Sequence, residues 1–520
     1  MSSGINNTAP ARPVPLKRNK ALPIPAVSAA LGMAASYYSY SLLASVPRGQ
    51  YFLAAMMLFL TAALCFLRVL RFPIKGNNAE KTHPSVVKTA ILVSAAVAGF
   101  FIGIMAARTV PGQAVMGIPA EMVSSVSGKL REDPRTLQGG SGLGILELRE
   151  CGSAGGLRAT ARGSLAVFFQ DESIPRLREF GRGCEIFIEG TLRLSENGRG
   201  PLFSANAVHI VKPASPTEQI RTWLRMTILE KFQYRGAPVW AGLASALLLG
   251  VRDDLDVDLS AGFRNSGCSH ILALSGMHLA IISGVLAFLL RRPLGIRWAS
   301  LVGAVFIVFY VFVAGSQPSL VRAAIMYLIG TAAIWGFLKT QPLSLLCMAF
   351  IIQIIFQSET GVSISFILSY LALFGILTLG GSIHSLLRGR VPEIINSGIS
   401  ASLGAFIATA PVVAIYFSSL RPIGIIAGLV LAPLASLFML LSLAALAFSF
   451  LPLPLWDLLN FPLGLLYRLI KFLVSQAGHL PGLDFLNPVQ VLIFSVTFWV
   501  VLLFLKNRDY NYRNSIASFD

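Results

Sequence analysis

Charged residues are scarce in this chain: they make up 13% of its 520 residues, whereas hydrophobic residues make up 55%. Soluble globular proteins carry about 25% charged residues because their surfaces face water. This shortage of charge excludes a water-soluble enzyme. Several apolar runs of about 18 residues or more, each long enough to cross hydrocarbon about 30 Å thick, indicate a polytopic α-helical membrane protein.

Acidic residues are scarcer than basic ones, with 24 Asp and Glu against 42 Lys and Arg, and the formal net charge is +18. Such an excess suits an anionic partner. Basic cytoplasmic loops, which orient membrane proteins, account for about half of it.

Cysteine is also rare, with five residues and no CxxC or HExxH pattern, so we expect no metal site and no cofactor. Only Cys151 and Cys184 fall in polar sequence. They are a candidate disulfide if that segment faces an oxidising compartment, and connectivity cannot be deduced from sequence.

Residues 1–20 form a basic tail, and residues 21–107 hold three apolar segments, near 21–44, 51–67 and 85–107. The first is too long for the apolar core of a signal peptide, so we expect three retained transmembrane helices. Basic residues gather in 1–20 and 68–88, which the positive-inside rule places in the cytoplasm. Residues from about 108 onward then emerge outside.

Residues 108–216 differ sharply from the rest, since glycines, charges and alternation with period two replace the apolar blocks. We expect five strands, listed as 120–130, 144–149, 157–169, 184–194 and 202–211. Five strands in about 100 residues favour an inserted, extracytoplasmic β-barrel of the OB type, a class that often binds single-stranded nucleic acid or sugars. A structural cap on the membrane part is an equally good interpretation.

The segment is nearly neutral, with 13 Lys and Arg against 11 Asp and Glu. Six of its cations are candidates for a DNA-binding stripe: Lys129, Arg131, Arg158, Arg162, Arg193 and Arg199. Phe168, Phe169 and Phe203 are stacking candidates, although such phenylalanines more often belong to a core.

Residues 217–235 have the pattern of an amphipathic helix on the membrane surface, and 239–249 is too short to span. Residues 236–505 form a second helix block with an interfacial helix at 456–476, and 506–520 is a polar tail. Its first predicted span follows His278 and ends near residue 290. The later predicted spans are 295–314, 319–338, 342–357, 363–380, 398–418, 423–450 and 488–505. The basic linker 291–297 belongs inside, but strict alternation leaves the side of the tail open.

The segment 270–278 places His270, Ser275, Gly276 and His278 in or beside a spanning helix. On one continuous helix the two histidines are about 80° apart and point roughly the same way. Polar groups in lipid need a protein or water partner, so these residues are candidates to line a channel, or else they cap and cross-link helices. The acidic run 254–258 lacks the glycine of a calcium loop and better suits helix capping.

Arg322 lies close to the start of an apolar helix, where an arginine is costly unless it snorkels, pairs or faces water. It is either a headgroup contact or a fixed cation lining a path for an anionic polymer. Ser365 and Ser369 are further lining candidates, although serines also mediate helix packing. We assign no catalytic residue.

The segment 270–278 reads His-Ile-Leu-Ala-Leu-Ser-Gly-Met-His and resembles the signature His-Leu-Leu-Ala-Ile-Ser-Gly-Leu-His of the ComEC competence protein family. Val321-Arg322-Ala323 with Met326 resembles the family's Leu-Arg-Ala before Met, and 365–372 resembles its Gly-Phe-Gln-Leu-Ser-Phe segment, with Ile367 in place of Gln. The chain also has Gly428 where the family tends to have Asn. The order of leading helices, barrel and helix block agrees over nearly the whole chain.

The resemblance implies an inner-membrane channel that brings single-stranded DNA into naturally transformable bacteria. Many family members add a metallo-β-lactamase-like domain, but no His-x-His-x-Asp-His motif occurs here, so we expect a channel without its own nuclease, and any strand degradation would have to come from another protein, a separate nuclease. No ATP-binding motif is present, so a cytoplasmic motor or strand-binding protein is expected to supply the force.

Two other interpretations stay open. One is a membrane enzyme or transporter for another anionic or lipid-linked substrate, with His270 or His278 as general base. The other is a non-catalytic scaffold in which the polar residues only hold helices together.

Overall fold

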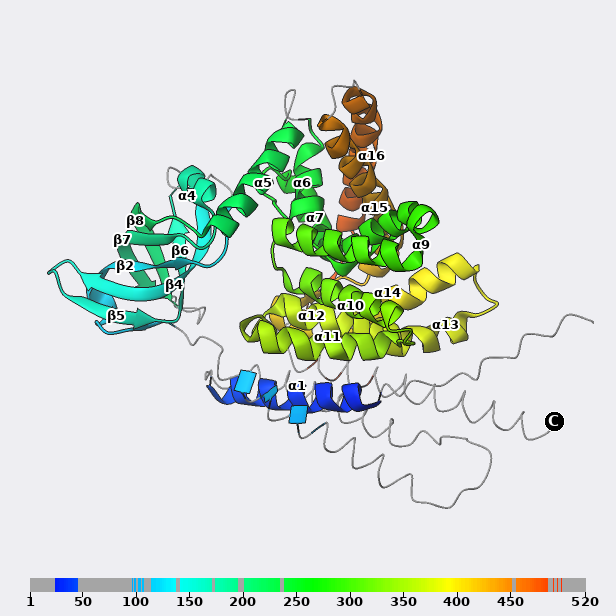
Figure 1. Cartoon of the computed structure of the whole chain (residues 1–520), viewed down its shortest axis with the longest axis horizontal. Coiled ribbons are helices and arrows are strands. Elements are labelled where there is room, and N and C mark those ends of the chain that lie inside the picture. The colour runs from blue at the N-terminus through cyan, green and yellow to red at the C-terminus, as the bar shows by residue number, and fades with distance from the viewer. Residues whose placement is uncertain are drawn as a thin grey trace, which may run out of the picture.

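The computed structural model describes residues 24–44, 114–136, 141–170, 174–194, 201–233, 238–450 and 455–484, with single positions between 96 and 106 and between 490 and 497. The predicted tails, the second span, most of the third span, the last span and Arg199 lie outside the described residues. Figure 1 shows a β domain on one side of a group of helices, with α5 (Pro216–Gln233) between them.

Five strands of the β domain close into a ring in the order β4, β2, β7, β8, β6 and back to β4. Neighbours are antiparallel except β6 and β8, which pair in parallel. The strands of this sheet are β1 (Val115–Met116), β2 (Val123–Leu130), β3 (Arg135–Thr136), β4 (Gly142–Ser153), β5 (Arg158–Arg162), β6 (Ser164–Phe169), β7 (Glu185–Leu194) and β8 (Pro201–Lys212). The five-stranded closed barrel predicted from the alternation is confirmed.

The barrel interior is filled by the inward-facing positions of the ring strands, as the period-two pattern requires. Phe169 and Phe203 are fully buried in this core, so they are core residues, and Phe168 is only half-buried. The predicted strand 157–169 is two strands, because Gly163 between them has a φ of 100°, which glycine adopts readily. A short helix, α4 (Ile174–Phe180), joins β6 to β7.

The helical part follows the expected apolar segments. Its helices are α1 (Ile24–Ala44), α6 (Ala241–Leu249), α7 (Val257–Asn265), α8 (Ser269–Leu272), α9 (Gly276–Ala314), α10 (Pro318–Trp335), α11 (Pro342–Phe356), α12 (Ile364–Gly375), α13 (Gly381–Leu387), α14 (Glu393–Phe417), α15 (Gly424–Ser449) and α16 (Leu455–Gly478). A π-helical turn, Ile376–Gly380, joins α12 to α13, and Ser419–Leu420 (β9) pairs with Leu483–Asp484 (β10). Within the described residues, six helical segments are long and apolar enough to cross a membrane.

Helix α9 has 39 residues, about twice the length that crosses the hydrocarbon, and it is bent rather than straight. Gly295 breaks it with a φ of 73°, two residues after Pro293. Beyond the bend, Arg297 stacks on Phe337 just after α10, with 4.0 Å between the guanidinium carbon and the ring centre. The bend therefore lies beside the α10–α11 connection.

Helix α16 covers the segment predicted as an interfacial helix, and it packs against neighbouring helices. Leu458–Gly478 is among the six segments long and apolar enough to span. Leu463, Ile470 and Val474 are buried in the core that α16 shares with α15 and α7. On the polar side of this helix, Lys471 Nζ donates to Asp256 Oδ2, just before α7, at 2.5 Å.

The barrel is held by loops at one end of the helices. Arg178 pairs with Asp253 before α7, and Arg131 pairs with Glu359 after α11. Arg182 donates to Ser316 Oγ, between α9 and α10, at 3.3 Å. These loops therefore lie at the barrel end of the helices, and α13 lies at the opposite end (Figure 1).

Candidate functional site

His270 and His278 do not share one helix. His270 lies in the short helix α8 and is exposed, Ala273 after α8 is extended, and α9 starts at Gly276. The prediction of two histidines about 80° apart on one helix is wrong, because the chain turns between them. Of the two, only His278 is buried, with none of its surface exposed.

The start of α9 is organised by Ser275 and His278. The backbone N–H of Ser275 donates to Nδ1 of His278 at 3.4 Å. With Nδ1 as acceptor, a neutral imidazole carries its proton on Nε2. Among the described atoms, neither that Nε2 nor the Ser275 hydroxyl has a hydrogen-bond partner, although both are buried.

The side chain of Arg322, in the second turn of α10, extends to the start of α9. Arg322 is 9% exposed, so it does not snorkel to the headgroups. One Nη donates to the backbone oxygen of Ser369 on α12, and the guanidinium carbon lies 5.8 Å from the Tyr370 ring centre. A Cβ on Gly276 would lie 2.9 Å from the other Nη, so the absent side chain leaves room for the arginine.

A chain of hydrogen bonds continues from Tyr370 into the neighbouring helices. Its hydroxyl donates to Gln353 Oε1 on α11 at 2.8 Å, and Gln353 Nε2 donates to the Pro318 oxygen at the start of α10 at 3.2 Å. Gln353 is fully buried and was not predicted from the sequence. A single amide in the largely apolar helix Pro342–Phe356 was the available signal.

We call this group the polar cluster; its members are Ser275, His278, Arg322, Gln353, Ser369 and Tyr370. Seven buried side-chain N or O atoms lack a partner within the described residues, and four belong to the cluster: Ser275 Oγ, His278 Nε2, Arg322 Nε and Ser369 Oγ. Buried polar atoms are normally satisfied, so such a concentration calls for a ligand or water. No described carboxylate pairs with Arg322, so the cluster offers donors and a fixed positive charge.

Two predicted lining residues lie outside the cluster. His270 is exposed on α8, and Ser365 is exposed in the first turn of α12. Gly276 lies beside the cluster, next to the guanidinium of Arg322.

The structure describes five of the six barrel cations, and they lie on or beside β2, β5 and β7. Lys129 lies between Glu147 on β4 and Glu185 on β7, its direct cross-strand neighbours. Arg131 is paired with Glu359. Arg158 and Arg162 are exposed on β5, Arg193 is exposed near the far end of β7, and Arg199 lies outside the described residues.

The candidate disulfide is wrong, because Cys151 and Cys184 are both free and buried. Cys151 on β4 pairs with Val126 on β2. Cys184 comes just before β7, the strand on the other side of β2, and its backbone oxygen accepts from the Leu130 N–H. The two are therefore about 13 Å apart along the strands and about 10 Å across them. A disulfide requires Cα atoms within about 7 Å.

A network of charges joins the barrel to α5. Asp133 Oδ2 lies 2.7 Å from Arg221 and 3.3 Å from Arg225. Burial raises the pKa of Asp133, but the hydrogen bond and charge of Arg221, together with Arg225, outweigh this and lower the pKa overall. The hydrogen bond to Glu218 raises the pKa of Arg182.

The acidic run 254–258 caps a helix, as expected. Asp256 Oδ1 accepts the N–H groups of Asp258 and Leu259 at the start of α7.

The fold and the cluster define a class: a polytopic helical membrane protein that carries a closed β-barrel and a buried cationic site. The Competence protein family model matches residues 247–508, half of the chain, and the chain belongs to this family. The polar cluster lies inside the matched region and the barrel outside it.

Two relatives extend this comparison. The chain is 26% identical over 290 residues to ComE operon protein 3 of Bacillus subtilis (strain 168), a match covering 52% of the chain and 35% of that protein. It is 27% identical over 322 residues to an uncharacterized protein of Aquifex aeolicus (strain VF5), covering 59% of the chain and 74% of that protein. The match thus spans about a third of the Bacillus relative, and no solved structure matches the chain.

Proposed function

We propose that the protein is a channel for uptake of single-stranded DNA across the bacterial inner membrane during natural transformation. The observation that carries this proposal is the buried Arg322, which lacks a carboxylate partner in the described chain and lies among unpartnered donors at the junction of α9, α10 and α12. A fixed cation in an apolar helix bundle offsets the charge of passing phosphates. The family and the name of the Bacillus relative support a role in competence.

The barrel, in this proposal, is of the OB type and receives the strand. Its ring order, its one parallel pair and the helix between β6 and β7 support that assignment. Arg158 and Arg162, both exposed on β5, are the proposed DNA contacts.

An extracytoplasmic barrel is supported by the charges of the helix connections. Connections at the end opposite the barrel are basic and include Arg291, Arg292, Arg297, Lys339, Arg388 and Arg390. The barrel-end loop 250–258 instead holds four aspartates and one arginine. By the positive-inside rule the barrel faces outside and the basic connections face the cytoplasm.

Force for transport comes, in this proposal, from a cytoplasmic motor or strand-binding protein, because the sequence contains no ATP-binding motif.

The test compares Arg322→Leu with Arg322→Lys in cells that depend on this protein for transformation. Arg322→Leu is expected to lower uptake of labelled DNA by about tenfold or more, the effect of about 1.4 kcal/mol on a barrier. Arg322→Lys keeps the charge and is expected to retain part of the uptake. Arg388→Leu, a loop arginine, is the control. Normal uptake by Arg322→Leu at equal protein level would remove the cluster from the path and favour a scaffold, in which the Tyr370–Gln353 bond only joins helices.

A further inference from the structure

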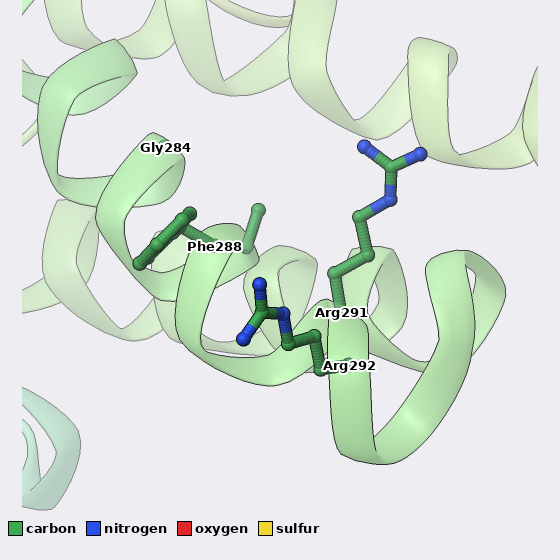
Figure 2. A pocket seen from close by; sticks show the side chains of 5 residues that line it. Gly284, Phe288, Arg291 and Arg292 are labelled. Carbon is green, nitrogen blue, oxygen red and sulfur yellow. The ribbon is translucent and has the colours of Figure 1, made fainter.

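The first half of α9 carries a hollow of about 550 Å³, lined by Gly284, Ala287, Phe288, Arg291 and Arg292 (Figure 2). Gly284, Ala287, Phe288 and Arg291 occupy positions i, i+3, i+4 and i+7, so they share one face of the helix. Phe288 is 75% exposed, and nothing lies within 4 Å of the place where a Cβ of Gly284 would be. The hollow thus joins an open apolar strip to two arginines.

Arg291 and Arg292 are both exposed, and neither has an ion pair or hydrogen bond with any described residue. Figure 2 shows their side chains extending from adjacent positions with the guanidinium groups apart. The nearby Arg297 differs, because it is stacked on Phe337. The two free guanidinium groups can therefore bind an anion.

This end of α9 has the composition of a membrane–water boundary. Just beyond the bend, Trp298 packs edge-on against Trp335 with ring centres 5.4 Å apart, and both are exposed. Exposed tryptophans beside arginines are typical of the headgroup level. The contact of Arg297 with Phe337 places this level at the α10–α11 connection, away from the barrel.

We propose that the hollow binds an anionic phospholipid of the leaflet opposite the barrel. Its phosphate lies between Arg291 and Arg292, and an acyl chain lies along Gly284, Ala287 and Phe288. Seven residues of helix separate Gly284 from Arg291, about 10 Å, so apolar contacts extend about that far below the headgroup. Charge complementarity and the apolar strip together favour a lipid over a nucleic-acid phosphate, which has no acyl chain to cover Phe288. The proposal is independent of DNA transport.

The experiment measures lipid retained by the purified full-length chain in native mass spectrometry, with phosphatidylglycerol or phosphatidylcholine added. The double variant Arg291→Gln/Arg292→Gln is expected to lower retention of phosphatidylglycerol about tenfold, since each cation near a headgroup contributes several-fold. Arg388→Gln/Arg390→Gln, which removes two arginines from another connection at the same end, is the matched control and is expected to change it less than twofold. Phe288→Ala is expected to weaken retention while both cations remain.

Four results would overturn the proposal: equal retention of phosphatidylcholine, unchanged retention in the double arginine variant, an equal loss in the matched control, or unchanged retention in Phe288→Ala. Displacement by inorganic phosphate would assign the site to free phosphate, and displacement by a single-stranded oligonucleotide would assign it to nucleic acid. If the double arginine variant does not fold, Phe288→Ala decides.

Discussion

At the scale of single residues, Gly276 controls where the Arg322 guanidinium lies. Gly276→Ala would place a methyl group 2.9 Å from Nη2 of Arg322 and 3.1 Å from Cβ of Ala323. The end of the arginine can move, so we expect a stability loss below about 1 kcal/mol. The displaced guanidinium no longer donates to the backbone oxygen of Ser369. DNA uptake is therefore expected to fall about tenfold, which corresponds to about 1.4 kcal/mol in the barrier to transport.

The matched control for this prediction is Gly330→Ala on α10, where nothing lies within 4 Å of the added Cβ. Thermal unfolding in detergent and uptake in cells are measured on both variants. Equal uptake by the two variants would show that the position of the guanidinium is unimportant.

Asp133 is the counter-ion of a nearly inaccessible arginine, since the Arg221 side chain is 2% exposed. Asp133→Asn is expected to lower the free energy of unfolding by about 3 kcal/mol at pH 7, because a buried charge loses its main partner. Glu185→Gln, which breaks the more exposed pair with Arg149, is the control and is expected to cost below about 1 kcal/mol.

The same pair predicts a dependence on pH. Folding lowers the pKa of Asp133, so its stabilisation is complete above the unfolded value of about 3.9 and is lost as pH falls through the folded value. The difference in unfolding midpoint between wild type and Asp133→Asn should be equal at pH 7 and about pH 5, and smaller below about pH 4. A difference that grows on acidification would contradict this assignment.

The residues of the site were predictable where a costly side chain stood in apolar sequence. This signal predicted Arg322, His278 and Ser275, and the structure brings these three residues together. His270 did not follow, because helical periodicity is meaningless across the break at Ala273. Gln353 was not predicted because a single amide in a helix is common. Its partner Tyr370 lies on α12, and only the packing of α11 against α12 brings the two side chains together.

At the scale of elements, α12 and α14 depend on two glycines in contact. A Cβ on Gly375 would lie 2.2 Å from the backbone oxygen of Gly404, which cannot move without its helix. Gly375→Ala is therefore expected to destabilise the protein by about 1–3 kcal/mol, the usual cost of overpacking. Gly381→Ala, with open space at its Cβ, is the control. Thermal unfolding in detergent measures both, and equal midpoints would contradict the close contact.

Element boundaries show what local sequence can and cannot reveal. The alternation of the barrel strands predicted the ring, because its pattern reports which face is buried. The seven-residue α4 was missed, since so short a helix is held by its neighbours and not by its own pattern. A helix on the membrane surface and a helix packed in the bundle can both carry a polar face, so the sequence of α16 does not distinguish them. The packing of α16 against α15 and α7 is visible only in the structure.

At the scale of the whole molecule, the barrel and the basic connections lie at opposite ends of the helices, which predicts opposite sides of the membrane. The test introduces one cysteine at a time into a cysteine-free chain. Gly155→Cys is exposed in the barrel, and Arg388→Cys is exposed between α13 and α14. A maleimide that cannot cross the inner membrane should label Gly155→Cys in intact cells and Arg388→Cys only after permeabilisation.

Both cysteines should react fully in lysed cells, which controls for accessibility. The expectation follows because the barrel is fixed to the loops that hold Asp253, Ser316 and Glu359, whereas Arg388 follows α13 at the other end. Labelling of Arg388→Cys but not Gly155→Cys in intact cells would show that the chain has the opposite orientation in the membrane. The barrel would then meet DNA only after it had crossed the membrane, as a receiver of the emerging strand rather than its entrance.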